Sequence, residues 1–135
     1  MMNMTDEDWQ TFAMKTIMYV GFPMATSWRI PLHDVPLFSA PESEEKFCCL
    51  VIDADHKWSF HFRKSLRENY FLPSDKALII FRGVLKEKLP DGRWKPIDSF
   101  KYEFTFDGSD ISFEREIPSE THKIQENYLR KMGRL

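Results

Sequence analysis

Glycine is scarce in this chain, with five glycines among 135 residues, and the glycine-rich loops that cradle phosphate groups are absent. The GxSxG turn that presents a catalytic serine and the HExxH pair that binds zinc are absent as well. These absences argue against the enzyme classes that depend on such motifs. They favour a binding function over catalysis.

Cysteines and long hydrophobic runs are also scarce. No stretch approaches the roughly 20 apolar residues that a membrane-spanning helix needs, and the N-terminus MMNMTDEDW lacks the basic and apolar regions of a secretory signal. The two cysteines, Cys48 and Cys49, are adjacent, and neighbouring Cα atoms lie too close together for an ordinary disulfide. We therefore expect a cytoplasmic protein without membrane contact, in which both thiols are reduced and buried.

Charge is unevenly distributed along a chain whose length suits one domain. Residues 1–135 are expected to form that single domain, and the 15% share of aromatic residues, including twelve phenylalanines, points to a core built on a sheet. Residues 1–55 carry nine acidic and three basic residues, residues 56–101 carry five and eleven, and residues 102–135 carry seven and five. The basic middle third predicts a surface for an acidic partner or a polyanion, provided that its cations share one face.

Two helices are predicted, one near each end of the chain. Thr5 and Asp8 form a variant of the capping box, and apolar residues then recur at helical spacing, which predicts a helix over 5–20. A second amphipathic pattern predicts a helix over 119–132. Between the first helix and the strands, several prolines indicate an irregular segment over 22–45.

The stretch DADHKWSFHFRKS has the pattern of a hairpin turn followed by a strand. Trp58, Phe60 and Phe62 alternate with polar residues, as expected for a strand with one apolar face. The preceding run KFCCLVID has the length of a buried strand, so residues 53–57 should form the turn between the two strands. The polar cluster DADHK is therefore explained by the turn.

The later part of the chain repeats this pattern. Two Asp-Gly pairs, at 91–92 and 107–108, predict tight turns between strands. After the second pair, apolar and polar residues alternate, and Arg115 interrupts the apolar row, either at a rim or as a functional charge. Antiparallel strands over about 46–117 thus complete an α+β fold, in which a meander of five or six strands packs against an N-terminal and a C-terminal helix.

No group of residues has the pattern of a metal or catalytic site. Asp53, Asp55 and His56 cluster in the predicted turn, but a calcium loop needs more oxygen ligands and a zinc site needs a second ligand pair. His61 is the best-placed histidine for acid–base chemistry, although its partners depend on neighbouring strands. We expect neither a metal nor a cofactor, and we assign no catalytic residue.

The segment SLRENYFLPSDK is the strongest candidate for a binding site. It places Tyr70, Phe71 and Leu72 in a polar connection, and aromatic residues on a loop often anchor a protein interface. Packing of these residues back into the core is the structural alternative. Basic residues near the loop would steer an acidic partner, and they are Arg63, Lys64 and Arg67.

Binding to a partner protein is the function that these features predict. A small chain without a catalytic pattern suits an inhibitor or immunity-type protein that neutralises a partner such as a bacterial toxin. A second hypothesis is a small apolar-ligand-binding protein or enzyme, whose cone-like sheet grips its ligand between phenylalanine-lined strands and a helix. A third hypothesis is nucleic-acid binding through the basic middle third.

Overall fold

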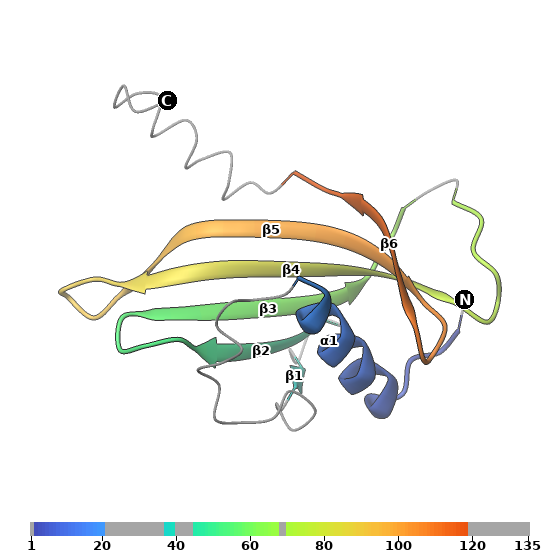
Figure 1. Ribbon diagram of the computed structural model, residues 1–135, viewed down its shortest axis with the longest axis horizontal. Coiled ribbons are helices and arrows are strands. Elements are labelled where there is room, and N and C mark those ends of the chain that lie inside the picture. Colours follow the sequence, from blue (N-terminus) through green and yellow to red (C-terminus); the bar gives the residue numbers. More distant parts are fainter. Residues whose placement is uncertain (1, 21–36, 40–44, 68–69, 119–135) are drawn as a thin grey trace.

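The fold is a six-stranded antiparallel sheet with one helix, in the residues that the computed structural model describes: 2–20, 37–39, 45–67 and 70–118 (Figure 1). The elements are α1 (Asp6–Val20), β1 (Phe38–Ser39), β2 (Lys46–Val51), β3 (His56–Lys64), β4 (Ala77–Lys88), β5 (Trp94–Phe106) and β6 (Ile111–Glu116). The strands follow one another across the sheet in chain order. The predicted N-terminal helix and antiparallel meander are therefore confirmed.

Two predicted segments differ from the described structure or lie outside it. The helix predicted over 119–132 lies outside the described residues, and the described fold is mostly β. The segment predicted as irregular over 22–45 contains β1, which pairs with β2 at the edge of the sheet, with the rings of Phe38 and Phe47 5.6 Å apart. Among the described residues, no helix has both the length and the apolar character that crossing a membrane requires.

Thr5 and Asp8 begin α1 in the way that the capping box predicts. The backbone N–H of Thr5 donates to Oδ2 of Asp8 at 2.9 Å, and the backbone N–H of Asp8 donates to Oγ1 of Thr5 at 3.1 Å. These two bonds satisfy N–H groups that the first turn of a helix leaves without a partner. From this start, α1 buries Trp9, Phe12 and Ile17.

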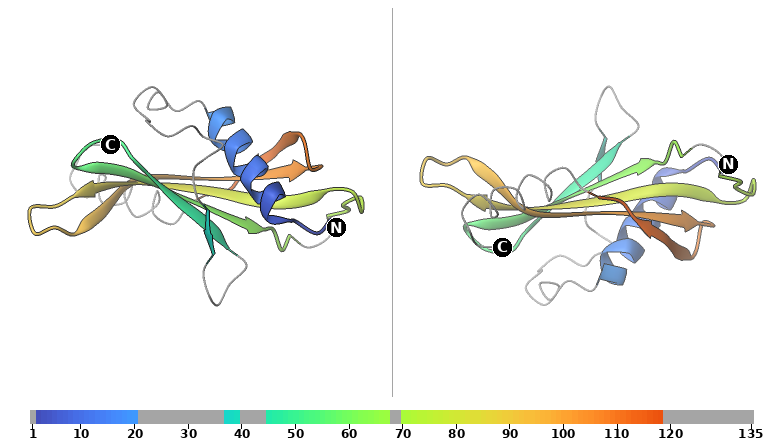
Figure 2. Two further views of the ribbon diagram at one scale, coloured as in Figure 1. Left: turned by 90° about the horizontal axis from the view of Figure 1, so that it is seen from below. Right: turned by 90° about the horizontal axis from the view of Figure 1, so that it is seen from above.

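One face of the sheet forms the core together with α1. The ring of Phe12 lies 5.5 to 6.2 Å from the rings of Phe62, Phe104 and Phe106, in edge-on contacts. Figure 2 shows α1 on this face, while the β4–β5 hairpin extends beyond the helix at the other end of the sheet. The buried side chains of this face confirm the predicted alternation in β3 and β5; from the strands they include Cys48, Leu50, Trp58, Phe60, Phe62, Ala77, Ile79, Phe81, Phe104 and Phe106.

Gly83 lets an aromatic ring lie directly against β4. It pairs with Phe60 on one side and with Phe100 on the other. The Phe100 ring occupies the space that a Cβ at Gly83 would need, and it lies 5.1 Å from the ring of Phe81. Glycine at this position therefore permits continuous ring packing across the middle of the core.

The two Asp-Gly turns are confirmed by their backbone geometry. Gly92 has φ of 89° and Gly108 has φ of 93°, a region that residues with a Cβ rarely adopt. Gly92 lies between β4 and β5, and Gly108 lies between β5 and β6. Both glycines therefore allow the chain to reverse where the sequence predicts a turn.

A β-bulge moves Arg115 off the apolar row that the sequence predicts. Phe104 pairs with Phe113, whereas Glu103 pairs with Arg115, so Glu114 is an extra residue on β6. Because successive side chains in a strand point to opposite faces, one extra residue reverses the face of those that follow. The prediction that Arg115 shares a face with Phe113 is therefore wrong. Arg115 lies on the face opposite α1, beside Glu103.

Candidate functional site

The face of the sheet opposite α1 collects many of the cations of the basic middle third. Residues directly opposite one another share a face, and the register aligns His61, Arg82 and Lys101 across β3, β4 and β5. We call this surface the polar face and define it by Lys57, Ser59, His61, Arg63, Arg82, Lys86, Lys101, Glu103, Thr105 and Arg115. Within this set Glu103 is the one acidic residue. Cations from four strands, β3 to β6, therefore share a face, as the polyanion and acidic-partner hypotheses require.

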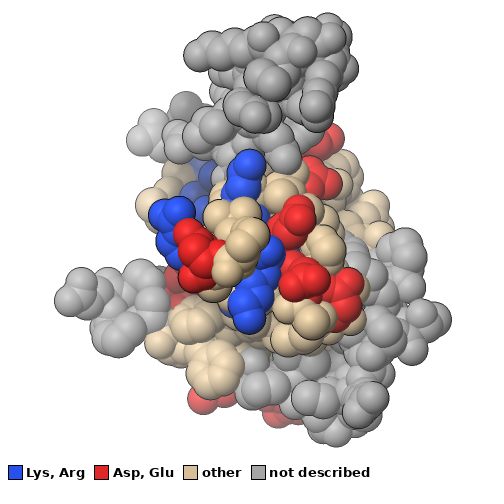
Figure 3. Space-filling model, turned by 90° about the vertical axis from the view of Figure 1, so that its left-hand side faces the viewer, with Lys and Arg blue, Asp and Glu red and all other residues tan. Residues whose placement is uncertain are grey.

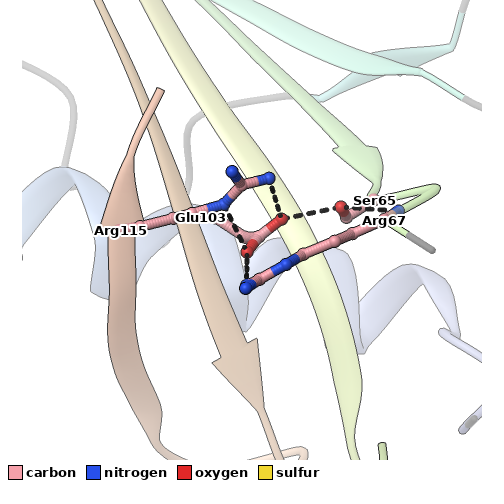
Figure 4. Close-up of polar contacts among 4 residues, drawn as sticks. All are labelled: Ser65, Arg67, Glu103 and Arg115. Atoms are coloured by element: carbon pink, nitrogen blue, oxygen red, sulfur yellow. Dashed lines mark hydrogen bonds and ion pairs between the residues drawn. The ribbon is translucent and has the colours of Figure 1, made fainter. Parts of the chain in front are cut away.

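Glu103 is the centre of a charge network on the polar face (Figure 4). Its side chain is fully buried, with 0% exposed. Arg67 Nη1 donates to Oε1 at 2.9 Å, Arg115 Nε donates to Oε1 at 3.1 Å and Ser65 Oγ donates to Oε2 at 2.8 Å. One buried carboxylate thus holds two arginines that come from different parts of the chain.

The hydrogen bonds that Glu103 accepts determine whether its carboxyl group is ionised. Burial alone would raise the pKa of this carboxyl group, because it disfavours the charged form. The bonds from Arg115, Ser65 and Arg67 favour the carboxylate and together hold the pKa of Glu103 below its ordinary value. Glu103 is therefore ionised at neutral pH, and the network of one carboxylate and two guanidinium groups carries a net positive charge.

Arg67 connects this network to the predicted binding loop. The guanidinium carbon of Arg67 lies 4.7 Å from the centre of the Tyr70 ring, within range of a cation–π interaction. Removal of solvent from the phenol, together with its hydrogen bond to Glu114, raises the pKa of Tyr70. Tyr70 is therefore held against the sheet by Arg67 of the network and by Glu114, the extra residue of the bulge in β6.

The structure separates the six residues predicted to bind a partner. Phe71 is 89% exposed, so its packing into the core is excluded, while Tyr70 and Leu72 are half-buried. Arg63 lies on the polar face, but Lys64 pairs with buried Ile79 and so lies on the opposite face. The residues brought together are Tyr70, Phe71, Leu72 and Arg67, and the neighbouring Leu66 is 84% exposed.

A pocket of about 110 Å³ opens on the polar face beside this network. Its lining residues are Glu45, His61, Arg63, Ile80, Arg82 and Lys101. Glu45 Oε1 lies 2.6 Å from Nδ1 of His61 and 3.9 Å from Nη2 of Arg82. Burial and the nearby Arg82 lower the pKa of His61, against the opposing effect of Glu45. His61 is therefore a neutral imidazole beside a carboxylate at pH 7.

The aspartates of the DADHK stretch lie in the turn that the sequence predicts over 53–57, but His56 and Lys57 are already the first residues of β3. The backbone N–H of Asp55 donates to Oδ1 of Asp53 at 2.8 Å, and Nδ1 of His56 lies 2.9 Å from the same oxygen. These bonds close the connection between β2 and β3. Within the described residues, no group of three or more His, Cys, Asp or Glu side chains is placed to hold a metal ion.

Charges of both signs alternate at the end of the sheet that carries the β4–β5 turn. Figure 3 shows lysine and arginine side chains there, interspersed with aspartate and glutamate. Arg93, for example, lies 2.6 Å from Asp91, and its side chain is 80% exposed. This end has no patch of one sign among the residues drawn in colour. The polar face differs from this end of the sheet because it carries the pocket and the Glu103 network.

Cys48 and Cys49 differ in exposure, which corrects the prediction that both are buried. Both thiols are free, but Cys48 is buried in the core and Cys49 is exposed on the other face. Successive residues of β2 point to opposite faces, and α1 covers one of them. Burial, with a smaller effect of Cys49, raises the pKa of Cys48 to about 12.

We expect the native protein to react with a maleimide reagent in two phases. Cys49 should react at least about tenfold faster than Cys48, because the thiolate is the reactive form and Cys48 is both buried and hard to ionise. Labelling of Cys48→Ser and Cys49→Ser variants, followed by mass spectrometry, identifies each phase. Equal rates at the two positions would contradict the assignment of faces in β2.

The sequence predicted the 70–72 loop as a binding site, which stays a prediction, and it did not predict the pocket or the Glu103 network. Their members come from β3, β4, β5 and β6, from the connection between β3 and β4, and from Glu45 directly before β2, so the strand register brings them together. The signal in the sequence was Arg115, a charge in the otherwise apolar row of residues 111–117. Comparisons of the chain with models of protein families, with curated proteins and with solved structures give no match.

Proposed function

We propose that this chain is a protein-binding module whose contact surface is the loop of Tyr70, Phe71 and Leu72 with the adjoining cation Arg67. The observation that carries this proposal is an almost fully exposed phenylalanine beside a charge network anchored in the sheet. Phe71 is 89% exposed, and Arg67, which packs on Tyr70, donates to the buried carboxylate of Glu103. An exposed aromatic side chain on an anchored support is well suited to fill a pocket on a partner.

The anchoring matters because ordering a surface costs free energy on binding. Side chains and loops that become fixed at an interface lose conformational entropy, and this loss is smaller when they are held in place beforehand. Tyr70 and Arg67 are held by contacts to Glu114 and Glu103. The positive charge of Arg67 beside the loop favours an acidic surface on the partner.

The other two hypotheses receive less support from the packing. The apolar-ligand hypothesis needs space between the phenylalanine-lined strands and the helix, but there the rings of Phe12 and Phe62 are in contact. The nucleic-acid hypothesis has cations on the polar face. However, the aromatic row of Trp58, Phe60 and Phe62 faces α1, so it cannot stack on bases.

Inhibition of a toxin is the most specific form of this proposal. An inhibitor or immunity-type protein of this kind would cover its target with the loop, and the basic residues would select a target whose surface is acidic. Two free cysteines support a cytoplasmic location, where thiols stay reduced.

The test compares two phenylalanine-to-alanine variants. Phe71→Ala should weaken binding of the partner by about tenfold or more, as expected for an anchor residue, and it should leave the fold intact. Phe38→Ala, which removes the same atoms from a 54% exposed ring on β1, is the matched control. Tagged wild type and both variants are used to capture proteins from the native cell, and calorimetry with the purified partner then gives the dissociation constants.

The proposal requires a protein that wild type and Phe38→Ala capture equally and that Phe71→Ala loses. Retention of every captured protein by Phe71→Ala would exclude this loop as the contact surface. Loss of the captured material after nuclease treatment would instead support nucleic-acid binding.

A further inference from the structure

Two contacts hold the imidazole ring of His61 in place on the polar face. Glu45 Oε1 lies 2.6 Å from its Nδ1, and the ring of Phe47, on the neighbouring strand β2, stacks on it with the ring centres 6.3 Å apart. The side chains of His61 and Glu45 are mostly covered, with 25% and 28% exposed. Because a neutral imidazole carries one N–H hydrogen, a carboxylate at Nδ1 places that hydrogen on Nδ1 and leaves the lone pair on Nε2.

The Nε2 atom of His61 is free to accept a proton. Among the residues that the structure describes, none forms a hydrogen bond with this nitrogen, and His61 lines the pocket of about 110 Å³. The imidazole is neutral at pH 7, because burial and Arg82 lower its pKa. The described residues of the lining include no serine, threonine or cysteine, so the nucleophile that His61 could activate is a water molecule. His61 and Glu45 thus have the arrangement of a general base with a carboxylate that positions it.

Arg63 supplies a cation beside this base. It follows His61 by two positions in β3, so the two side chains share the polar face, with about 7 Å between their Cα atoms. Within the described part of the chain, Arg63 has neither a hydrogen-bond partner nor an ion-pair partner, whereas Arg82 lies 3.9 Å from Glu45. The guanidinium group of Arg63 is therefore available to stabilise one negative charge on an oxygen atom in the pocket.

We propose that His61 is the general base of a site that hydrolyses small carboxylic esters, with Glu45 as its positioning residue. Nε2 of His61 takes a proton from a water molecule while the water oxygen forms a bond to the ester carbonyl carbon. The carbonyl oxygen becomes an oxyanion, which Arg63 stabilises. When the bond from this carbon to the leaving oxygen breaks, the imidazolium returns the proton to that oxygen, so one ester and one water give one acid and one alcohol.

The pocket favours an ester with a short acyl group. Ester hydrolysis places one negative charge on one oxygen, which suits the one guanidinium group of Arg63, whereas phosphoryl transfer spreads charge over three oxygens. A volume of about 110 Å³ holds a group of a few heavy atoms, such as an acetyl group, and Ile80 is the apolar residue of the lining. A long acyl chain would extend into solvent. This site does not require the partner-binding proposal, because its lining shares no residue with the 70–72 loop.

The test measures the release of nitrophenol from p-nitrophenyl acetate by the purified chain. His61→Gln should lower kcat/KM by about 100-fold, as expected for the loss of a general base. His56→Gln is the matched control, because His56 also lies 2.9 Å from a carboxylate oxygen, that of Asp53, but it is outside the pocket. This control should keep the wild-type kcat/KM within about twofold. The octanoate ester, whose acyl chain is longer than the pocket can hold, should be a poorer substrate than the acetate.

The pH profile shows which histidine acts. Because the pKa of His61 is lowered from its ordinary value of 6.5, kcat/KM should rise with pH to a plateau, with a midpoint below pH 6.5. The bond to Asp53 raises the pKa of His56, so a profile set by His56 would have its midpoint above pH 6.5. Glu45→Gln should lower the plateau by about tenfold and move the midpoint to lower pH, because the carboxylate raises the pKa of His61. A residue with a structural role alone would not move the midpoint. The charged groups around His61 are Glu45, Arg63, Arg82, Lys86 and Lys101.

A pair of arginine variants tests the stabilisation of the oxyanion. Arg63→Gln should lower kcat by about tenfold or more with little change in KM, because the oxyanion exists only after the substrate has bound and reacted. Arg93→Gln removes the same charge at the β4–β5 turn, far along the chain from the pocket residues of β3, and it should keep the wild-type kcat.

Equal values of kcat/KM for wild type and His61→Gln would overturn the proposal. So would a midpoint above pH 6.5, equal losses in Arg63→Gln and Arg93→Gln, or release that stops after about one equivalent per chain, which is acylation of a side chain and not turnover. Circular dichroism and thermal melts of each variant ensure that lost activity is read only from folded protein. None of these outcomes depends on whether Phe71 binds a partner.

Discussion

Replacing Phe60 by alanine is expected to lower the free energy of unfolding by about 3 to 5 kcal/mol. The Phe60 side chain is 0% exposed, and its ring lies 5.8 Å from the ring of Trp58 and 5.5 Å from that of Phe81. Alanine would remove these contacts and leave a cavity at a position where the chain is held between two neighbouring strands. Urea titration followed by fluorescence and circular dichroism measures the loss.

Phe71→Ala is the matched control for this loss. It removes the same atoms from a side chain that is 89% exposed, so the free energy of unfolding should change by no more than about 0.5 kcal/mol. His61→Ala, one residue away on the opposite face, should also have a much smaller effect than Phe60→Ala. If Phe60→Ala and His61→Ala cost the same, the assignment of the two faces of β3 would be wrong.

The alternation of side chains explains why much of the sheet could be predicted from the sequence. In β3 and β5 a single apolar face produces a period of two, and the pattern therefore specifies which residues face the core. The helix start was predictable for a similar reason, since Thr5 and Asp8 bond each other over three residues. Local interactions of this kind depend only on residues that are close together in the sequence.

The features that could not be predicted depend on pairing between strands. The bulge at Glu114 shifts β6 by one residue relative to β5, and the sequence of β6 does not show where the extra residue lies. Arg115 interrupts the apolar pattern because it belongs to the other face. The exposed thiol of Cys49 likewise follows from a helix that covers only one side of β2.

The candidate sites depend even more on the pairing between strands, so less of them could be predicted from the sequence. Ser65 and Arg67 lie more than 35 positions before Glu103 in the sequence, and the network forms because β3, β4 and β5 are neighbours. The pocket likewise depends on the alignment of His61, Arg82 and Lys101. Sequence patterns identify the exposed aromatic loop, because its composition is unusual for a connection. They do not identify which charges meet across a sheet.

Replacing Glu103 by glutamine is expected to lower the free energy of unfolding by about 2 to 3 kcal/mol at pH 7. The glutamine fills the same space but offers one neutral oxygen to donors from Arg67, Arg115 and Ser65, and its own amide hydrogens face these donors. The loss should be below the largest values known for broken buried ion pairs, because both arginines are partly exposed and can be solvated. Glu116→Gln, on the exposed part of β6, is the control and should change stability by less than about 0.5 kcal/mol.

The pH dependence of this difference tests whether the charge of Glu103 is responsible. The folded pKa of Glu103 is lowered below its ordinary value of 4.5, so the unfolded chain takes up the proton first as the pH falls. The stabilisation by the carboxylate is therefore fully present above pH 4.5 and is lost as the pH falls through the folded pKa. Urea titrations of wild type and Glu103→Gln should show a constant difference between pH 6 and 8 that shrinks below about pH 4.5. A difference that stays constant down to pH 3 would mean that the glutamine destabilises the fold through its shape or its misplaced donors, and the buried carboxylate would not be what holds Arg67 beside the loop.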